Sequence, residues 1–143
     1  MAIIYTIGFT KKSLEEFINI LKTNKITKLV DIRLNRNSQL SGFAKEKDLK
    51  YIIEKILGIK YEIVPDFFPT PEILKDYRKD KDWEKYEKKF QELMNKRNGK
   101  ELIKRLLKGG KIICLLCSES KPNKCHRRLV AELLKGDIEI FHL

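Results

Sequence analysis

The chain has 143 residues, of which 42% are hydrophobic and 36% are charged, and its formal net charge is +11. This length suits a single domain spanning residues 1–143, and no apolar run reaches the roughly 18 residues that a membrane span needs. The N-terminal sequence lacks the basic start and the cleavage site of a signal peptide. We therefore expect a cytoplasmic protein with no membrane partner, whose three cysteines are free thiols.

The positive charge allows two interpretations. Long-range attraction favours an anionic partner, either a small molecule such as a phosphate or nucleotide, or a nucleic acid. Alternatively, Lys and Glu enrichment is common in heat-stable proteins, and basic and acidic residues are mixed along almost the whole of this chain. The sequence leaves both interpretations open, and it does not determine the oligomeric state.

The first half of the chain alternates between predicted strands and helices. Ser13 and Glu16 form a capping box that opens one helix, and apolar residues between positions 49 and 57 form the face of a second helix, which Gly58 ends. Three segments rich in β-branched and aromatic residues are predicted to be strands: residues 3–7, 28–34 and 61–64.

A long helical segment, roughly residues 66–108, interrupts this alternation. Trp83, Tyr86 and Phe90 lie there at helical spacing, a pattern typical of a face packed against the core. Strands are expected again at residues 111–117 and 138–141, on either side of a helix at 126–135. This order predicts an α/β fold, with a mostly parallel central sheet, helices on both faces, and a helical insertion between strands three and four.

Polar residues follow the expected strands at the edge where an open parallel sheet binds ligands, the carboxyl ends of its strands. A packed core does not require such residues, so we interpret them as a candidate site. They are Gly8 and Thr10 after the first strand, Asp31 and Arg33 at the second, and Cys117, Ser118 and Glu119 after the fourth.

The three cysteines raise the question of a metal or redox site. Cys114 and Cys117 have the C-x-x-C spacing of zinc ligands, but they are an odd number of positions apart on an expected strand, so their side chains should point to opposite faces. A redox C-x-x-C motif opens a helix, whereas this one ends a strand. Cys125 and His126 are neighbours in the sequence, and neighbours seldom bind one ion together. We therefore expect no metal and no cofactor.

The segment after Cys117 suggests an anion site instead. Free N–H groups at a helix start attract anions and lower the pKa of a nearby thiol, and Arg127 could add a bidentate contact to phosphate or carboxylate. The loop has no glycine, however, and Asn123 stands where the Cys-x5-Arg spacing of cysteine phosphatases needs arginine. A covalent phosphatase is not expected. Each thiol also has a core-packing alternative.

Three motifs, in order along the chain, resemble the domain of unknown function 488 family. YTIGFT at 5–10 with SLEEF at 13–17 is similar to the family's YTIGHS…SLEEF, except that Phe9 replaces a frequent histidine. VDIR at 30–33 with GFAK at 42–45 is similar to VDVR…GFNK, and LLCSE at 115–119 with CHR at 125–127 is similar to LLCxE…CHR. The resemblance implies no reaction. It places seven residues in motif positions: Asp31, Arg33, Cys117, Glu119, Cys125, His126 and Arg127.

The leading hypothesis from the sequence is a pocket for an anionic, phosphate- or nucleotide-like ligand, and whether the protein is an enzyme stays open. Cys117 is the candidate nucleophile, Glu119 or Asp31 the acid–base group, and His126 an orienting or proton-transfer group. The expected ligand-binding residues are Gly8, Thr10, Arg33, Ser118, Cys125 and Arg127.

Two other functions remain open at this stage. One is a partner-binding subunit that uses the helical segment 66–108. The other is a non-enzymatic nucleic-acid-binding module, held by phosphate contacts and therefore sensitive to salt. Its basic surface would include Arg33, Arg36, Arg78, Lys79, Lys88, Lys89, Arg97, Lys104 and Arg105.

Overall fold

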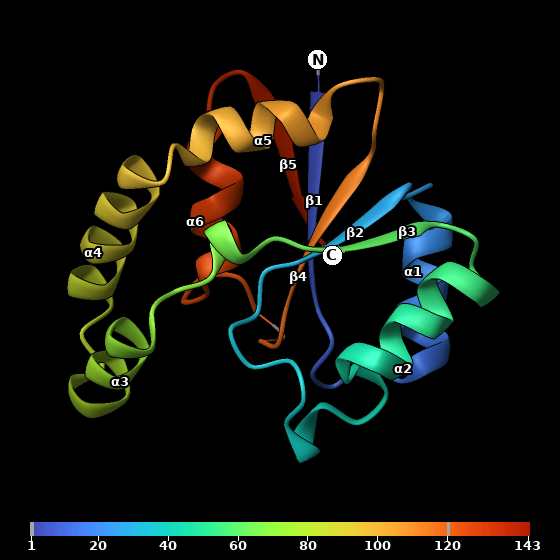
Figure 1. The fold of residues 1–143 in the computed structure, drawn as a ribbon, viewed down its shortest axis with the longest axis horizontal. Helices are drawn as coiled ribbons and strands as arrows, with labels where there is room; N and C mark the ends of the chain where they lie inside the picture. Colours follow the sequence, from blue (N-terminus) through green and yellow to red (C-terminus); the bar gives the residue numbers. More distant parts are fainter. Residues whose placement is uncertain (1, 120) are drawn as a thin grey trace.

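A five-stranded sheet forms the centre of the computed structural model, which describes residues 2–119 and 121–143 (Figure 1). All pairs of neighbouring strands are parallel, and the order across the sheet is β3-β2-β4-β1-β5. The mostly parallel sheet predicted from the sequence is therefore confirmed. The strands are β1 (Ala2–Gly8), β2 (Lys28–Asp31), β3 (Lys60–Ile63), β4 (Ile113–Cys117) and β5 (Ile138–His142).

One face of the sheet is covered by α1 (Leu14–Thr23), α2 (Glu46–Tyr51) and the π-helical turn η2 (Ile52–Ile56). The predicted capping box opens α1, since the Glu16 N–H donates to Ser13 Oγ at 3.1 Å and the Ser13 N–H donates to Glu16 Oε1 at 3.4 Å. Apolar side chains from these helices pack on the sheet. They include Phe17, Leu21, Leu49 and Ile53, all of them buried.

The opposite face carries α3 (Pro71–Asp80), α4 (Trp83–Lys96), α5 (Gly99–Leu107) and α6 (His126–Ala131). Figure 1 shows α3, α4 and α6 on one side of the sheet and α1 and α2 on the other, so helices lie on both faces as predicted. No helix in the described ranges is both long enough and apolar enough to cross a membrane. Short 3-10 turns complete the fold: η1 (Gln39–Ala44), η3 (Pro65–Phe67) and η4 (Glu132–Leu134).

Alternation along β4 separates two of the cysteines. Cys114 and Leu116 belong to the core beneath α1 and α2, whereas Ile113 and Leu115 belong to the core beneath α4 to α6. The Cys117 side chain points to the same face as Ile113 and Leu115, where its sulfur contacts His126 of α6. The expectation that Cys114 packs in the core and points away from Cys117 is confirmed.

β2 is shorter than the predicted strand at residues 28–34, because it ends at Asp31. Ile32 still donates its N–H to the Leu116 carbonyl at 3.2 Å. Beyond it, the Arg33 N–H turns back to Asp31 Oδ1 at 3.1 Å. A local hydrogen bond to the Asp31 side chain thus takes the place of the next backbone hydrogen bond between strands. The pattern of apolar residues alone does not show that a side chain competes for this N–H group.

Candidate functional site

A pocket opens at the carboxyl end of β4, where the topology of the sheet changes direction. The chain leaves β1 and β2 toward the α1 and α2 face, but it leaves β4 toward α6 on the other face. Such switch points leave a crevice in open parallel sheets, and β4 lies between β1 and β2. The pocket has a volume of about 350 Å³.

Three separate parts of the chain form its walls. Residues 33–35 follow β2, and residues 117–119 and 124–126 come from the end of β4, its connection to α6 and the start of α6. The remaining wall comes from Pro69, α3, α4 and the turn between these two helices. Of the β4–α6 connection, Ser120 lies outside the described residues. The wall residues used below are Tyr77, Arg78, Lys81, Trp83, Tyr86 and Lys124.

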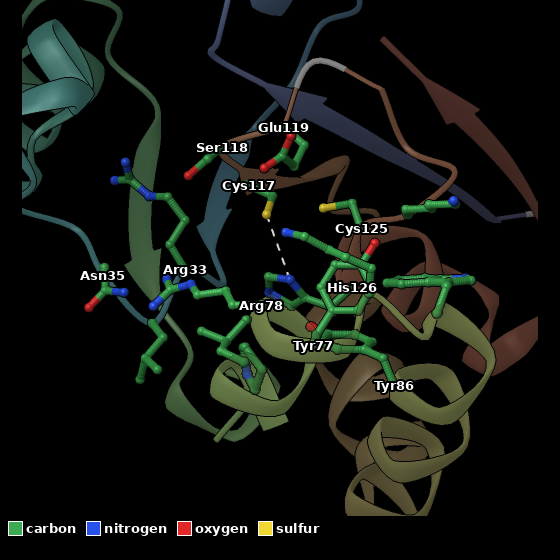
Figure 2. Close-up of a pocket in the computed structure, with 16 residues that line it drawn as sticks. Arg33, Asn35, Tyr77, Arg78, Tyr86, Cys117, Ser118, Glu119, Cys125 and His126 are labelled. Atoms are coloured by element: carbon green, nitrogen blue, oxygen red, sulfur yellow. Dashed lines mark hydrogen bonds between the residues drawn. The ribbon is translucent and has the colours of Figure 1, made fainter. Parts of the chain in front are cut away.

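Cys117, Cys125 and His126 form the floor of the pocket, and all three are buried. Figure 2 shows both sulfur atoms pointing into the same space, with the His126 ring facing Cys117. The Cys117 Sγ lies 3.6 Å from His126 Nδ1, and His126 Nε2 lies 2.6 Å from the Ile32 carbonyl oxygen. A carbonyl only accepts hydrogen bonds, so Nε2 carries a hydrogen and Nδ1 is turned toward the sulfur.

The floor residues alter one another's protonation. The hydrogen bond from Cys125, helped by the adjacent His126, lowers the pKa of the Cys117 thiol despite its burial. The same hydrogen bond, together with burial, raises the pKa of the Cys125 thiol. Burial by itself lowers the pKa of His126, but the nearby Cys117 outweighs burial and the pKa of His126 is raised. The three side chains therefore behave as one coupled group.

The same three residues could hold a metal ion. Each offers one ligand atom, and these atoms all lie within 4.8 Å of one another. The sequence interpretation set Cys125 and His126 aside as joint ligands because they are neighbours. Cys125 precedes the first residue of α6 in an extended conformation, so successive side chains reach the same space from different backbone angles.

Asp31 and Arg33 form a buried ion pair next to the pocket. Arg33 Nε and Nη2 donate to the two carboxylate oxygens of Asp31 at 2.9 and 2.7 Å, and the Tyr61 hydroxyl also donates to Asp31. Burial and the Asp31 carboxylate raise the pKa of Tyr61, which keeps that hydroxyl protonated. Asp31, a predicted acid–base group, does not line the pocket that contains Cys117.

Arg33 does line the pocket, but much of its charge is matched by Asp31. Its Cζ atom lies 5.4 Å from the centre of the Phe9 ring, the position where the family motif often has histidine. Arg33 Nη1 is buried and has no hydrogen-bond partner among the described residues. The two N–H groups of Nη1 are therefore unsatisfied among the described residues.

The other predicted binding residues divide into two groups. Ser118 and Cys125 line the pocket, as does Glu119, whose side chain is exposed at the rim. Gly8, Thr10 and Arg127 do not line the pocket. Gly8 packs closely against the Glu119 carbonyl and the Arg127 side chain, and the Thr10 N–H donates to the Ser118 carbonyl, so these residues contact or adjoin the β4–α6 connection. α6 has only six residues, so the expected attraction of a helix start for anions is small here.

Residues 13–134 match the family model described as "Domain of unknown function DUF488". The chain belongs to this family. The matched range contains the LLCSE and CHR motifs, which supply the pocket floor of this DUF488 chain. No curated protein and no solved structure matches the chain.

The sequence interpretation missed the wall formed by α3 and α4. It assigned Trp83 and Tyr86 to a core-packing face, and Tyr86 is indeed buried, but both residues also line the pocket. Arg78 was included only in a general basic surface. The order of elements could have indicated this wall, because the helical segment follows β3, and the carboxyl end of β3 lies at the same edge of the sheet as Cys117.

Proposed function

We propose that this DUF488 chain binds an anionic ligand with a planar group, such as a nucleotide, in the pocket beside Cys117. One observation carries the proposal: aromatic and cationic side chains line the same pocket. Tyr77, Trp83 and Tyr86 supply aromatic surface, and Arg78, Lys81 and Lys124 supply positive charge. A nucleotide presents both a planar base and a phosphate, and therefore complements both features.

The cations of the wall are available to a ligand. Within the described part of the chain, Arg78, Lys81 and Lys124 form no ion pair. Lys81 stands over the Tyr77 ring, with Nζ 5.6 Å from the ring centre. An anion at the pocket mouth would gain charge-assisted hydrogen bonds that the protein does not already satisfy.

Some of the basic residues that the nucleic-acid alternative would use already have partners within the protein, which favours the pocket over that alternative. Arg36 pairs with Glu46 at 2.7 Å, Lys89 with Asp76 at 3.1 Å and Lys104 with Glu101 at 3.5 Å. The Arg97 guanidinium donates to the Asp66 and Phe68 carbonyls. A phosphate backbone would have to compete with these partners at several of the positions expected to bind it.

The aromatic wall is held in a fixed arrangement. Trp83 stacks on Tyr86 with ring centres 4.7 Å apart, and Tyr77 meets Trp83 edge to face at 5.7 Å. The Phe90 ring lies between this cluster and the floor, with its centre 5.6 Å from the centre of the His126 ring. Such packing limits rotamer freedom, so a planar group would bind without much loss of side-chain entropy.

Any reaction on the bound ligand would take place at the floor. Cys117 and His126 lie where the deeper end of the ligand would rest, and Glu119 at the rim is the exposed carboxylate that could exchange protons with solvent. Asp31 takes no part in this proposal, because Arg33 and Tyr61 occupy its oxygens.

Trp83 makes the binding proposal directly measurable, because it is the single tryptophan of the chain and lines the pocket. A nucleoside monophosphate is expected to change its fluorescence with saturation, more strongly than inorganic phosphate or the uncharged nucleoside. Arg78→Ala should weaken the nucleotide affinity by about 10-fold or more, since hydrogen bonds to charged groups contribute about 1.5–3 kcal/mol.

Arg105→Ala is the matched control for that titration. Arg105 is exposed on α5 and does not line the pocket, and its substitution removes the same charge as Arg78→Ala. The Arg105→Ala variant should bind the nucleoside monophosphate with the same affinity as the wild type. Equal weakening by both substitutions, with binding that declines steeply as salt is added, would instead support the nucleic-acid alternative. Absence of any fluorescence response and of any calorimetric heat would reject the pocket proposal.

A further inference from the structure

We propose that Cys117, Cys125 and His126 bind a zinc-like metal ion whose fourth coordination position opens into the pocket. The proposal concerns the floor of the pocket and does not require that the wall bind a nucleotide. If both are correct, the ion would lie at the deep end of the bound ligand. Cys117 would then act as a metal ligand rather than as a free nucleophile.

The spacing of the ligand atoms fits tetrahedral coordination. With Zn–S near 2.3 Å and Zn–N near 2.0–2.1 Å, a tetrahedral angle places sulfur and nitrogen about 3.6 Å apart. Cys117 Sγ and His126 Nδ1 are 3.6 Å apart in the structure. The Cys125 sulfur is within 4.8 Å of both atoms, compared with the roughly 3.8 Å that separates two sulfur ligands of one tetrahedral ion.

His126 is already oriented as a metal ligand. Its Nε2–H donates to the Ile32 carbonyl oxygen at 2.6 Å, which fixes both the tautomer and the ring plane. Metal-binding histidines nearly always hold their second nitrogen in this way. Nδ1 is left with its lone pair directed at the space shared with the two sulfur atoms.

Burial favours an ion of charge +2 with these ligands. Cys117, Cys125 and His126 are only 6%, 3% and 6% exposed. Two thiolates and one neutral imidazole balance a divalent cation, so the filled site carries no net charge into the protein interior. Binding would release the thiol protons that are present, and the affinity would therefore fall as the pH is lowered.

The ligand types select the metal class and suggest its role. Thiolate and imidazole suit zinc and similar soft or borderline ions, whereas magnesium and calcium prefer oxygen. Sites with three protein ligands and one open position are typical of catalytic rather than structural zinc. All three residues line the pocket, so the open position would face a bound ligand.

Cobalt titration of the full chain tests the proposal. The protein is stripped with a chelator under reducing conditions and titrated with Co²⁺, in the absence of any anionic ligand. One equivalent should produce thiolate-to-cobalt charge-transfer absorption, and Zn²⁺ should displace it. Zn²⁺ should also raise the melting temperature, because ligands that bind only the folded state stabilise it. No thiolate band at saturating cobalt would overturn the proposal.

Cysteine variants locate the site, and the chain supplies its own control. Cys117→Ser and Cys125→Ser should weaken Co²⁺ binding by about 100-fold or more, because even outer-shell partners contribute about 10- to 100-fold. Cys114→Ala removes a buried thiol from the other core and should bind Co²⁺ as the wild type does. Equal losses in all three variants, or no loss in Cys125→Ser, would contradict the assignment.

X-ray absorption of the zinc-loaded wild type keeps the test independent of whether a variant folds. It should show two sulfur and one or two nitrogen or oxygen neighbours, and a shell of oxygen and nitrogen alone would reject the site. Arg78→Ala separates the two proposals, since it should lose nucleotide affinity and retain cobalt affinity. Cobalt binding without nucleotide binding would leave the metal site standing and reject the proposed function.

Discussion

Replacing Asp31 with asparagine is expected to lower the free energy of unfolding by about 3–5 kcal/mol, because it leaves a buried guanidinium without its counter-charge. Arg33 is only 2% exposed, and Asp31 is fully buried. Asp31 also accepts hydrogen bonds from the Arg33 backbone N–H and from Tyr61. An amide keeps part of this hydrogen bonding but none of the negative charge. Urea denaturation followed by circular dichroism measures the loss.

A double substitution supplies the control for Asp31→Asn. Asp31→Leu with Arg33→Met removes both charges and keeps apolar volume, so it should destabilise the protein less than Asp31→Asn alone. The coupling energy of the pair follows from the cycle of Asp31→Leu, Arg33→Met and the double variant, as the loss in the double variant minus the sum of the losses in the two single variants. A loss below about 1 kcal/mol for Asp31→Asn would show that, without the carboxylate, Arg33 is solvated by water or paired with another anionic group.

Gly8→Ala should lower the free energy of unfolding by about 3 kcal/mol or more, at or above the upper end of overpacking effects. A Cβ at Gly8 would lie 1.6 Å from the Glu119 carbonyl oxygen and 2.7 Å from Arg127 Nη1. The first contact is with backbone, so the β4–α6 connection must move. Thermal and urea unfolding measure the stability, and cobalt titration of the folded fraction reports whether Cys117 remains in place.

Gly99→Ala is the matched control, since its new methyl group would meet a flexible side chain. The nearest atom is Leu133 Cδ1 at 3.0 Å, and Gly99 begins α5, where alanine favours the helix. We expect its stability to remain within about 1 kcal/mol of the wild type. A similar loss in Gly8→Ala and Gly99→Ala would show that the close approach of Glu119 has no special importance.

Much of the fold follows from patterns that act over short distances. Ser13 and Glu16 cap α1 as predicted, and alternation along β4 sends Cys114 and Cys117 to opposite faces as predicted. Both results depend on the fixed geometry of one element, which its own sequence determines. The sequence also predicted which edge of the sheet carries Cys117, because parallel strands bring their carboxyl ends together.

Features that depend on distant partners were not predictable in the same way. Nothing near Asp31 in the sequence shows that the Tyr61 hydroxyl donates to its carboxylate, or that Arg127 lies beside Gly8. Adjacency in sequence also misled the assessment of Cys125 and His126, since the direction of each side chain changes where an extended residue meets a helix. The helical wall was visible as helices, but its place over Cys117 depends on tertiary packing.

The central position of β4 has a consequence for how the protein is made. β1 and β2 are synthesised before β4, yet β4 separates them in the sheet, and partners such as Ile4 and Ile113 are far apart in the sequence. A growing polypeptide therefore leaves the edges of β1 and β2 that face β4 unpaired until residues 113–117 leave the ribosome. Pairing over such separations is slow and leaves apolar edges open to aggregation. We expect the sheet to form only after β4 has been synthesised, and the thiols of Cys117 and Cys125 to be enclosed only after that step.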